Sequence, residues 1–223
     1  MAYLKKKGYA PEILDEDMEI LKKAAGEITF MGVNYYQSCV CEYNPMDGVT
    51  PYGTMNTTGV KGSAQELGMQ GIYKNPVNPY LMTTDWDWTI DPMGLRFCCR
   101  EITSRYGLPI VISENGLGAF DKKTEDDQIH DEYRIDYLKK HIEQLKLMID
   151  EGIPVLGYCP WSFIDVVSSH QGFQKRYGLV YVDRTETDPK QCARIKKDSF
   201  YWYKEVIRNN GLTKESIRGK QNG

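Results

Sequence analysis

Three short apolar segments, separated along the chain by helical stretches, constrain the fold of this sequence more than any other feature. Each is rich in β-branched or aromatic residues and short enough for a buried strand; they lie at residues 28–36, 108–113 and 153–159. Helices are predicted at residues 15–25, 92–106, 131–151 and 198–209. This alternation is typical of βα units, so we expect an α/β fold around a parallel sheet.

The remaining segments predict less regular structure. Residues 37–88 are rich in Gly, Asn, Pro and Tyr and have no clear period, and such a long loop in a compact domain is usually functional. Residues 177–182 are typical of an edge strand in a hairpin, and residues 212–223 of a frayed tail. On the helix at 131–151 we expect a buried apolar face formed by Tyr133, Ile135, Leu138, Ile142, Leu145 and Met148.

Charge and cysteine content argue against several classes of protein. The formal net charge is −3, and no run of about eighteen apolar residues occurs, so neither a nucleic-acid partner nor a membrane span is expected. The first residues contain no apolar stretch of the kind found in export signals, and the six cysteines form no Cys-x-x-Cys pair. We therefore expect a cytoplasmic protein with free thiols and with no metal or cofactor.

The strongest candidate for catalysis is Glu114, in the run V-I-S-E-N-G at residues 111–116. It lies where an apolar strand is expected to end and a glycine-containing loop to begin. In parallel α/β sheets, active sites form at the carboxyl ends of the strands, and a carboxylate there can act as nucleophile or general base. On this pattern alone, a surface glutamate beside a turn explains Glu114 equally well.

Polar and aromatic residues also follow the other two predicted strands. Asn34 and Tyr36 close the first strand, and Trp161 follows the third. Each is also explained as a core or rim residue of an ordinary sheet. Three consecutive strand ends of this kind nevertheless favour one shared site over three separate coincidences.

A basic segment follows the third predicted strand at residues 168–178. Within it, Ser168, Lys175 and Tyr177 offer a hydroxyl, an ammonium and a phenol, which are suitable donors for a phosphate group. The alternative is a solvated basic turn. Spacing alone favours that alternative, because clustered charges usually lie on the surface.

Taken together, the motifs resemble glycoside hydrolase family 1 over residues 11–211. They occur in the family's order as G-V-N-Y-Y, W-T-I-D-P-M-G-L, I-S-E-N-G, P-W-S-F-I-D and S-F-Y-W-Y-K. Members of the family are (β/α)8 barrels that hydrolyse β-glycosides with retention. The resemblance implies that residues 1–223 form the C-terminal half of such a TIM barrel, an α/β unit with parallel barrel strands 6, 7 and 8 and their helices. Residues 1–27 would then form the helix before barrel strand 6.

The resemblance implies roles for four of the strand-end residues. Glu114 matches the catalytic nucleophile of the family, and Tyr36 matches the tyrosine that donates a hydrogen bond to it. Asn34 matches a polar residue of the same site. Trp161 matches the aromatic floor on which the apolar face of the sugar stacks.

The same resemblance, applied to the basic segment at residues 168–178, implies a phosphorylated substrate. Members that bind unphosphorylated sugars have a glutamate where this chain has Ser168, and that carboxylate would repel a 6-phosphate. Lys175 and Tyr177 match the phosphate-binding pair of the 6-phospho-glycosidases. Ser169, in place of tryptophan, resembles the 6-phospho-β-glucosidases more than the 6-phospho-β-galactosidases. The galactosidases stay the alternative, and unphosphorylated β-glucosidases come third.

The family's acid/base carboxylate does not occur in this sequence. It comes from an N-E-P motif after barrel strand 4, whereas Asn44 and Pro45 are followed here by Met46. We therefore expect an incomplete site for 6-phospho-β-glucosides of the cellobiose, arbutin or salicin type. It would depend on a separate N-terminal half-barrel chain or on self-association. An inert half-barrel remnant is the alternative of another class, and Glu42 or Asp165 would have to replace the acid if the chain acted alone.

Overall fold

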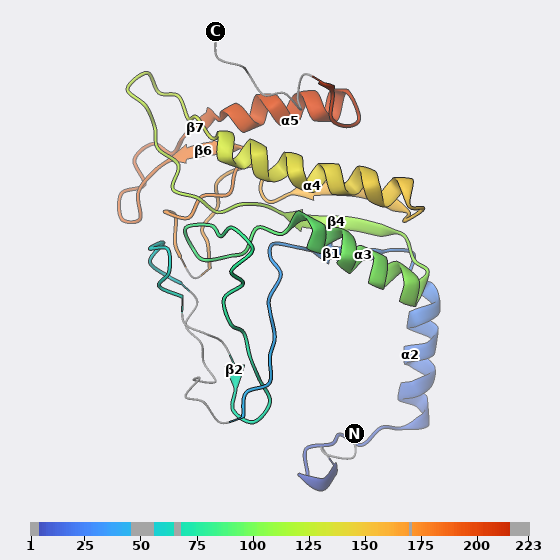
Figure 1. The fold of residues 1–223 in the computed structure, drawn as a ribbon. Coiled ribbons are helices and arrows are strands. Elements are labelled where there is room, and N and C mark those ends of the chain that lie inside the picture. Colours follow the sequence, from blue (N-terminus) through green and yellow to red (C-terminus); the bar gives the residue numbers. More distant parts are fainter. Residues whose placement is uncertain (1–4, 46–55, 65–67, 170, 215–223) are drawn as a thin grey trace.

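The centre of the molecule is a parallel sheet of three strands in the order β1-β4-β5 (Figure 1). The structure is a computed structural model that describes residues 5–45, 56–64, 68–169 and 171–214. The strands of the central sheet are β1 (Met31–Asn34), β4 (Ile110–Asn115) and β5 (Val155–Pro160). The predicted α/β fold with three parallel strands is confirmed. Within the described residues the sheet stays open and no barrel closes, with β1 and β5 as its edges.

Two prolines explain why the second and third strands begin later than predicted. Pro109 and Pro154 lack a backbone N–H and so cannot donate to the ladder. Their carbonyls instead accept from the neighbouring strand, Pro109 from Met31 at 2.8 Å and Pro154 from Ile110 at 2.9 Å. The apolar run therefore starts before the regular strand does.

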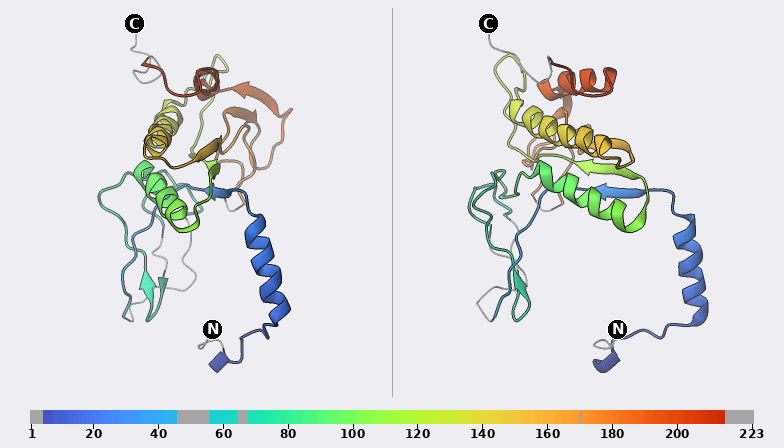
Figure 2. Two further views of the ribbon diagram at one scale, coloured as in Figure 1. Left: turned by 90° about the vertical axis from the view of Figure 1, so that its right-hand side faces the viewer. Right: turned by 45° about the vertical axis from the view of Figure 1, so that its right-hand side comes forward.

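Three helices pack side by side against the sheet (Figures 1 and 2). They are α3 (Pro92–Tyr106), α4 (Glu132–Asp150) and α5 (Asp198–Arg208), all close to the predicted bounds. The shared core joins strands and helices and contains Val33, Leu95, Cys99, Ile110, Ile112, Ile142, Leu145, Met148 and Val206. Alternate residues of β4 face the helices, which leaves the residues between them toward the other face of the sheet.

The buried face of α4 differs from the predicted one at its N-terminal end. Leu138, Ile142, Leu145 and Met148 are buried as expected. Tyr133 is 40% exposed, however, and the buried face includes Arg134, Tyr137 and His141. Hydrophobic periodicity assigns a charged residue to solvent, whereas ion pairs keep Arg134 in the interior.

The N-terminal helix α2 (Asp15–Glu27) lies apart from this core. It has no buried residue, and Figures 1 and 2 show it projecting away from the sheet. The helix predicted before the first strand is confirmed for these residues, and residues 1–4 lie outside the described part. Its apolar side chains Met18, Ile20 and Leu21 are all exposed, so they do not pack against the core of this structure.

Two small hairpins complete the described structure. The pair β2 (Gly68–Met69) and β3 (Tyr73–Lys74) lies within the long connection after β1. The pair β6 (Val180–Asp183) and β7 (Ala193–Lys196) is antiparallel, which confirms the hairpin predicted near residues 177–182. Most of the predicted frayed tail, residues 215–223, lies outside the described part. None of the described helices is long and apolar enough to cross a bilayer.

Candidate active site

Glu114 lies at the carboxyl end of β4, next to the end of β1. The backbone N–H of Tyr35 donates to the Glu114 carbonyl at 2.8 Å, which ties the two strand ends together. The Tyr36 hydroxyl then donates to Oε2 of Glu114 at 2.5 Å. The structure therefore brings together the two residues that sequence reasoning paired, although they are far apart in the chain.

The Tyr36 hydroxyl stays protonated and so remains a hydrogen-bond donor to the Glu114 carboxylate. Burial, and then the hydrogen bond to Glu114, raise the pKa of Tyr36 well above its ordinary value. The phenol therefore keeps its proton at neutral pH. A donor of this kind fixes one carboxylate oxygen of Glu114 and aims the other.

Asn115, directly after Glu114, braces the end of β4. It is fully buried, and its Nδ2 donates to the Tyr35 carbonyl at 2.8 Å and to the Tyr137 hydroxyl at 3.1 Å. Its Oδ1 accepts from the Tyr158 hydroxyl at 2.7 Å. These bonds join β1, α4 and β5 to the residue that follows the candidate nucleophile. Sequence reasoning singled out the E-N-G run but assigned Asn115 no role.

Trp161 is placed beside the same strand end by its backbone. Its N–H donates to the Asn115 carbonyl at 2.8 Å, and a Cβ on Gly116 would lie only 1.8 Å from the Trp161 carbonyl oxygen. Only glycine at position 116 allows this approach. The Trp161 side chain is 36% exposed and so remains open to a ligand.

Asn34 and Ser113 form a polar pair on the open face of the sheet. The Ser113 hydroxyl donates to Oδ1 of Asn34 at 2.6 Å. Both residues are exposed and lie at neighbouring strand ends, with Asn34 in register with Glu114. The geometry is compatible with the predicted sugar-binding role of Asn34, which stays a prediction.

The two basic side chains of this segment, Lys175 and Arg176, are buried, so the solvated basic turn that spacing alone favoured is wrong. Lys175 is 1% exposed and Tyr177 is 5% exposed. Among the described residues, Nζ of Lys175 has no hydrogen-bond partner, and it lies 3.6 Å from the ring centroid of Trp88. Burial lowers the pKa of Lys175 to about 8. An ammonium in such surroundings is a ready partner for an anion.

The side chain of Arg176 points to the opposite side of the backbone from those of Lys175 and Tyr177. Arg176 exchanges both backbone hydrogen bonds with Ala119, at 2.9 and 3.0 Å. Its guanidinium lies in the interior and donates to Oδ2 of Asp165 at 3.0 Å. Because successive side chains point to opposite sides, Lys175 and Tyr177 share the other side.

Ser168 lies next to Tyr177 and within its own tight turn. Burial raises the pKa of Tyr177 above its ordinary value, and a hydrogen bond with Ser168 offsets part of that shift. The Ser168 hydroxyl donates to Oε1 of Gln171 at 2.7 Å, and Ser169 beside it is exposed. Ser168, Lys175 and Tyr177 therefore belong to one region, as predicted.

Aromatic rings connect the basic segment to the candidate nucleophile. The Tyr36 ring lies edge-on to Trp88 at 5.5 Å and to Tyr177 at 6.5 Å between centroids. The Trp86 and Phe120 rings pack at a tilt of 32°, with 4.4 Å between their centroids. Sequence reasoning missed Trp86 and Trp88 as parts of the site. The repeated tryptophan in D-W-D-W, inside a long segment without period, was the signal that could have found them.

Gly118 allows Lys175 and Tyr177 to approach the β4 loop. A Cβ at this position would lie 2.5 Å from Cε of Lys175 and 3.0 Å from Cζ of Tyr177. We expect Gly118→Ala to lower the free energy of unfolding by about 1–3 kcal/mol, because the added methyl overfills a packed region. Urea unfolding of the purified chain measures the effect.

Gly26→Ala is the matched control for this prediction. A Cβ there meets nothing within 4 Å, and Gly26 lies in α2, so its change should be neutral or slightly stabilising. Equal unfolding free energies for the two variants would contradict the packing described for Gly118.

The family of the chain follows from comparison with known proteins. The sequence profile of glycosyl hydrolase family 1 matches residues 1–212. The chain belongs to glycosyl hydrolase family 1. The aryl-phospho-β-D-glucosidase BglC of Bacillus subtilis is 54% identical over 208 residues, which cover 93% of this chain and 43% of that relative. A 6-phospho-β-galactosidase of Clostridium acetobutylicum is 39% identical, with 91% of this chain and 41% of that relative covered.

A solved structure shows the same relation to the family. A family 1 β-glucosidase from Thermotoga maritima has a TM-score of 0.74 and 32% identity, covering 96% of this chain and 41% of that one. The chain thus spans about two fifths of the length of the proteins it matches. The predicted family is confirmed, and so is the expectation that the match covers only part of a family 1 protein.

A buried ion network supports the loops of this family 1 chain. Lys197, which is fully buried, donates to Oδ1 of Asp165 at 2.8 Å and also contacts Asp121. Arg134 donates to Oδ1 of Asp121 at 2.7 Å, and Arg176 pairs with Asp165. The network ties the loops after β4 and β5 to the starts of α4 and α5. It therefore fixes the segments that carry the candidate phosphate-binding residues.

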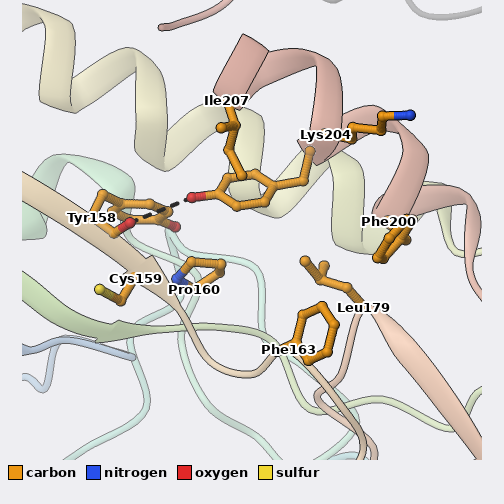
Figure 3. A pocket seen from close by; sticks show the side chains of 9 residues that line it. Tyr158, Cys159, Pro160, Phe163, Leu179, Phe200, Lys204 and Ile207 are labelled. Atoms are coloured by element: carbon orange, nitrogen blue, oxygen red, sulfur yellow. Dashed lines mark hydrogen bonds between the residues drawn. The ribbon is translucent and has the colours of Figure 1, made fainter.

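An apolar groove lies on another part of the family 1 chain, between the edge strand β5 and α5 (Figure 3). Its volume is about 510 Å³, and its lining residues are Tyr158, Cys159, Pro160, Phe163, Leu179, Phe200, Tyr203, Lys204 and Ile207. Phe163 and Ile207 are 64% and 65% exposed. The lining is almost entirely apolar, with Lys204 as its one charged residue.

In the part of the chain that the structure describes, one group of possible metal ligands occurs at the surface. His130, Glu132 and Asp198 each offer an atom, and these atoms lie within 4.8 Å of one another. His130 and Asp198 already pair at 2.7 Å, and that pairing raises the pKa of His130. Asp198 also begins α5, where the helix dipole disfavours a cation. Two of the three residues in this group are thus already paired with each other.

Proposed function

We propose that this chain supplies the nucleophile and the phosphate subsite of a retaining 6-phospho-β-glucosidase. The observation that carries the proposal is the pairing of two features in one aromatic cluster. Tyr36 holds the Glu114 carboxylate at 2.5 Å, and beside it the Lys175 ammonium is buried without a hydrogen-bond partner among the described residues. The names of the relatives support the same substrate class.

Glu114 would act as the nucleophile of a double displacement. One carboxylate oxygen attacks the anomeric carbon while the bond to the aglycone oxygen breaks and the acid/base carboxylate gives that oxygen its proton, so a covalent glycosyl-enzyme forms. The acid/base carboxylate then takes a proton from water, which attacks the same carbon. The bond to Glu114 breaks, and the sugar leaves with retained configuration. Tyr36 keeps the carboxylate aligned during both steps, because its hydroxyl remains a donor throughout.

The substrate's 6-phosphate would bind at the basic segment. Lys175 supplies the positive charge, and Tyr177 and Ser168 supply hydroxyl donors from the same region. Asn34 would bind a sugar hydroxyl and Trp161 would stack on the sugar ring. Ser169, in place of tryptophan, favours glucosides by its resemblance to the 6-phospho-β-glucosidases, although a 6-phospho-β-galactosidase is among the relatives.

The acid/base carboxylate would come from a part of the family 1 protein that this chain does not contain. No Asn-Glu-Pro run occurs in the 223 residues, and retaining enzymes need a second carboxylate about 5–5.5 Å from the nucleophile. The exposed edges of β1 and β5, the apolar groove and the uncovered side of α2 are surfaces for such a half-barrel. The three strands then correspond to barrel strands 6, 7 and 8.

Lys175→Met tests the phosphate subsite directly. We expect the affinity for glucose 6-phosphate to fall at least about tenfold, because a hydrogen bond to a charged group contributes about 1.5–3 kcal/mol. Affinity for glucose should not change. The same variant should be more stable to urea, because it removes a buried and unpaired charge.

Lys204→Met is the control, since Lys204 lines the apolar groove on α5. Isothermal calorimetry with both sugars and urea unfolding provide the measurements. Unchanged glucose 6-phosphate binding in Lys175→Met would contradict the phosphate subsite. Failure of the wild-type chain to bind either sugar would favour the inert remnant.

A further inference from the structure

The Lys175 ammonium is held among aromatic rings and not among polar groups. Its Nζ lies 3.6 Å from the ring centroid of Trp88, 5.1 Å from that of Trp86 and 5.5 Å from that of Tyr177. The atom is buried, and it has no hydrogen-bond partner in the part of the chain that the structure describes. An ammonium has three N–H donors, and aromatic ring faces do not provide the oxygen acceptors with which these donors form their strongest hydrogen bonds.

A tight turn fixes Trp88 in this position. The Thr84 hydroxyl accepts hydrogen bonds from the N–H groups of Trp86 and Trp88, both at 3.2 Å, and the Thr84 N–H donates to the Trp88 carbonyl at 2.9 Å. The Asn56 amide donates to Oδ2 of Asp87 at 2.9 Å. The indole of Trp88 therefore belongs to a well-braced turn and is not a loose surface ring.

A phosphate cannot contact this ammonium while the Trp88 ring covers it. The backbone of the basic segment is anchored, because Arg176 pairs with Ala119 through two hydrogen bonds and with Asp165 through its side chain. Lys175 has a flexible four-carbon stem, so its Nζ can leave the ring while the backbone stays in place. The Trp88 ring and the phosphate of a substrate are thus alternative partners of the Lys175 ammonium.

We propose that Trp88 sets the affinity of the site for phosphorylated sugars by competing with the phosphate for the Lys175 ammonium. The inference rests on the proposed function, in which Lys175 binds the 6-phosphate. A phosphorylated sugar offers an anion that is a stronger partner than the indole face. An unphosphorylated sugar offers none, so the ammonium stays on the ring. Trp88 is therefore a positioning residue that determines specificity.

Calorimetric titration of the wild-type chain and its variants with glucose 6-phosphate and with sodium sulfate tests the competition. Removing the ring in Trp88→Leu should tighten binding of both anions by about twofold to thirtyfold, the range expected from losing one cation–π contact. Trp88→Phe keeps a weaker ring and should lie between wild type and Trp88→Leu. If Trp88→Leu fails to fold, the anion affinity of Trp88→Phe alone tests the competition.

Two further variants make the outcomes distinct. Tyr201→Leu removes an exposed ring on α5 and should leave both affinities unchanged. Anion binding that is lost in Lys175→Met but unchanged or weakened in the Trp88 variants would overturn the competition and leave the proposed function standing. Anion binding that does not depend on Lys175 would overturn the phosphate subsite itself.

Discussion

Glu114→Gln is expected to lower turnover of a 6-phospho-β-glucoside by about four orders of magnitude or more, as nucleophile loss does in other covalent enzymes. The amide cannot form the glycosyl ester, although it still accepts the hydrogen bond that Tyr36 now donates to Glu114. The measurement is steady-state hydrolysis of 4-nitrophenyl 6-phospho-β-glucoside by the chain together with the N-terminal part of its Bacillus subtilis relative.

Glu125→Gln is the matched control for this variant. Glu125 is exposed on the connection between β4 and α4, in the loop that follows Glu114. Its replacement should leave turnover within about twofold of the parent, because surface changes away from a site have small effects. A Glu114→Gln chain that keeps most of its activity would show that another carboxylate is the nucleophile.

Lys197→Met should have the largest effect on stability. Lys197 is buried between Asp121 and Asp165, and breaking a buried ion pair by removing one partner typically costs about 3–5 kcal/mol. Burial raises the pKa of Asp121, but Arg134 and Lys197 outweigh it and hold that pKa below its ordinary value. Without Lys197, each carboxylate keeps one arginine as its nearby cation, Arg134 for Asp121 and Arg176 for Asp165.

Urea unfolding of Lys197→Met and Lys196→Met measures this effect against a neighbouring lysine. Lys196 is exposed on β7, and its change should stay within about 1 kcal/mol of wild type. Similar losses in the two variants would mean that the buried network does not stabilise the loops around the site. A loss confined to Lys197→Met supports its role.

The strands and most helices of this fold are predictable because local signals coincide with the tertiary structure. For α3, Asp91 caps the N-terminus by accepting from Gly94 at 3.0 Å, and Gly107 ends the helix with φ of 66°. The bounds predicted for that helix are those observed. The first residues of the second and third strands are predicted less accurately, because Pro109 and Pro154 belong to the apolar runs but do not donate to the hydrogen-bonded ladder.

The buried polar residues were not predictable from the sequence. Arg134 and His141 lie in the interior of α4, where periodicity expects only apolar side chains. Arg134 is buried because Asp121 and Asp131 meet it from other segments. A pattern along one helix contains no information about charges that another segment brings to it, so only the folded structure shows such pairs.

The candidate site was predictable where strand ends carry it and not where the long loop does. Glu114 and Tyr36 end neighbouring strands, and strand order alone places them together. Trp86 and Trp88 come from the long connection after β1, where no period fixes a conformation. Their contact with Lys175 depends on tertiary structure and was therefore missed.

The most direct test of this account is the hydrolysis of 4-nitrophenyl 6-phospho-β-glucoside by the chain alone and after addition of the N-terminal part of the Bacillus subtilis relative. We expect activity only when that part is present, because it supplies the acid/base carboxylate, and we expect that activity to be lost in Glu114→Gln. Full activity of the chain alone would contradict it. Such a result would mean that another carboxylate within these 223 residues acts as the acid; it would not be Asp165, which is buried and paired with Arg176 and Lys197.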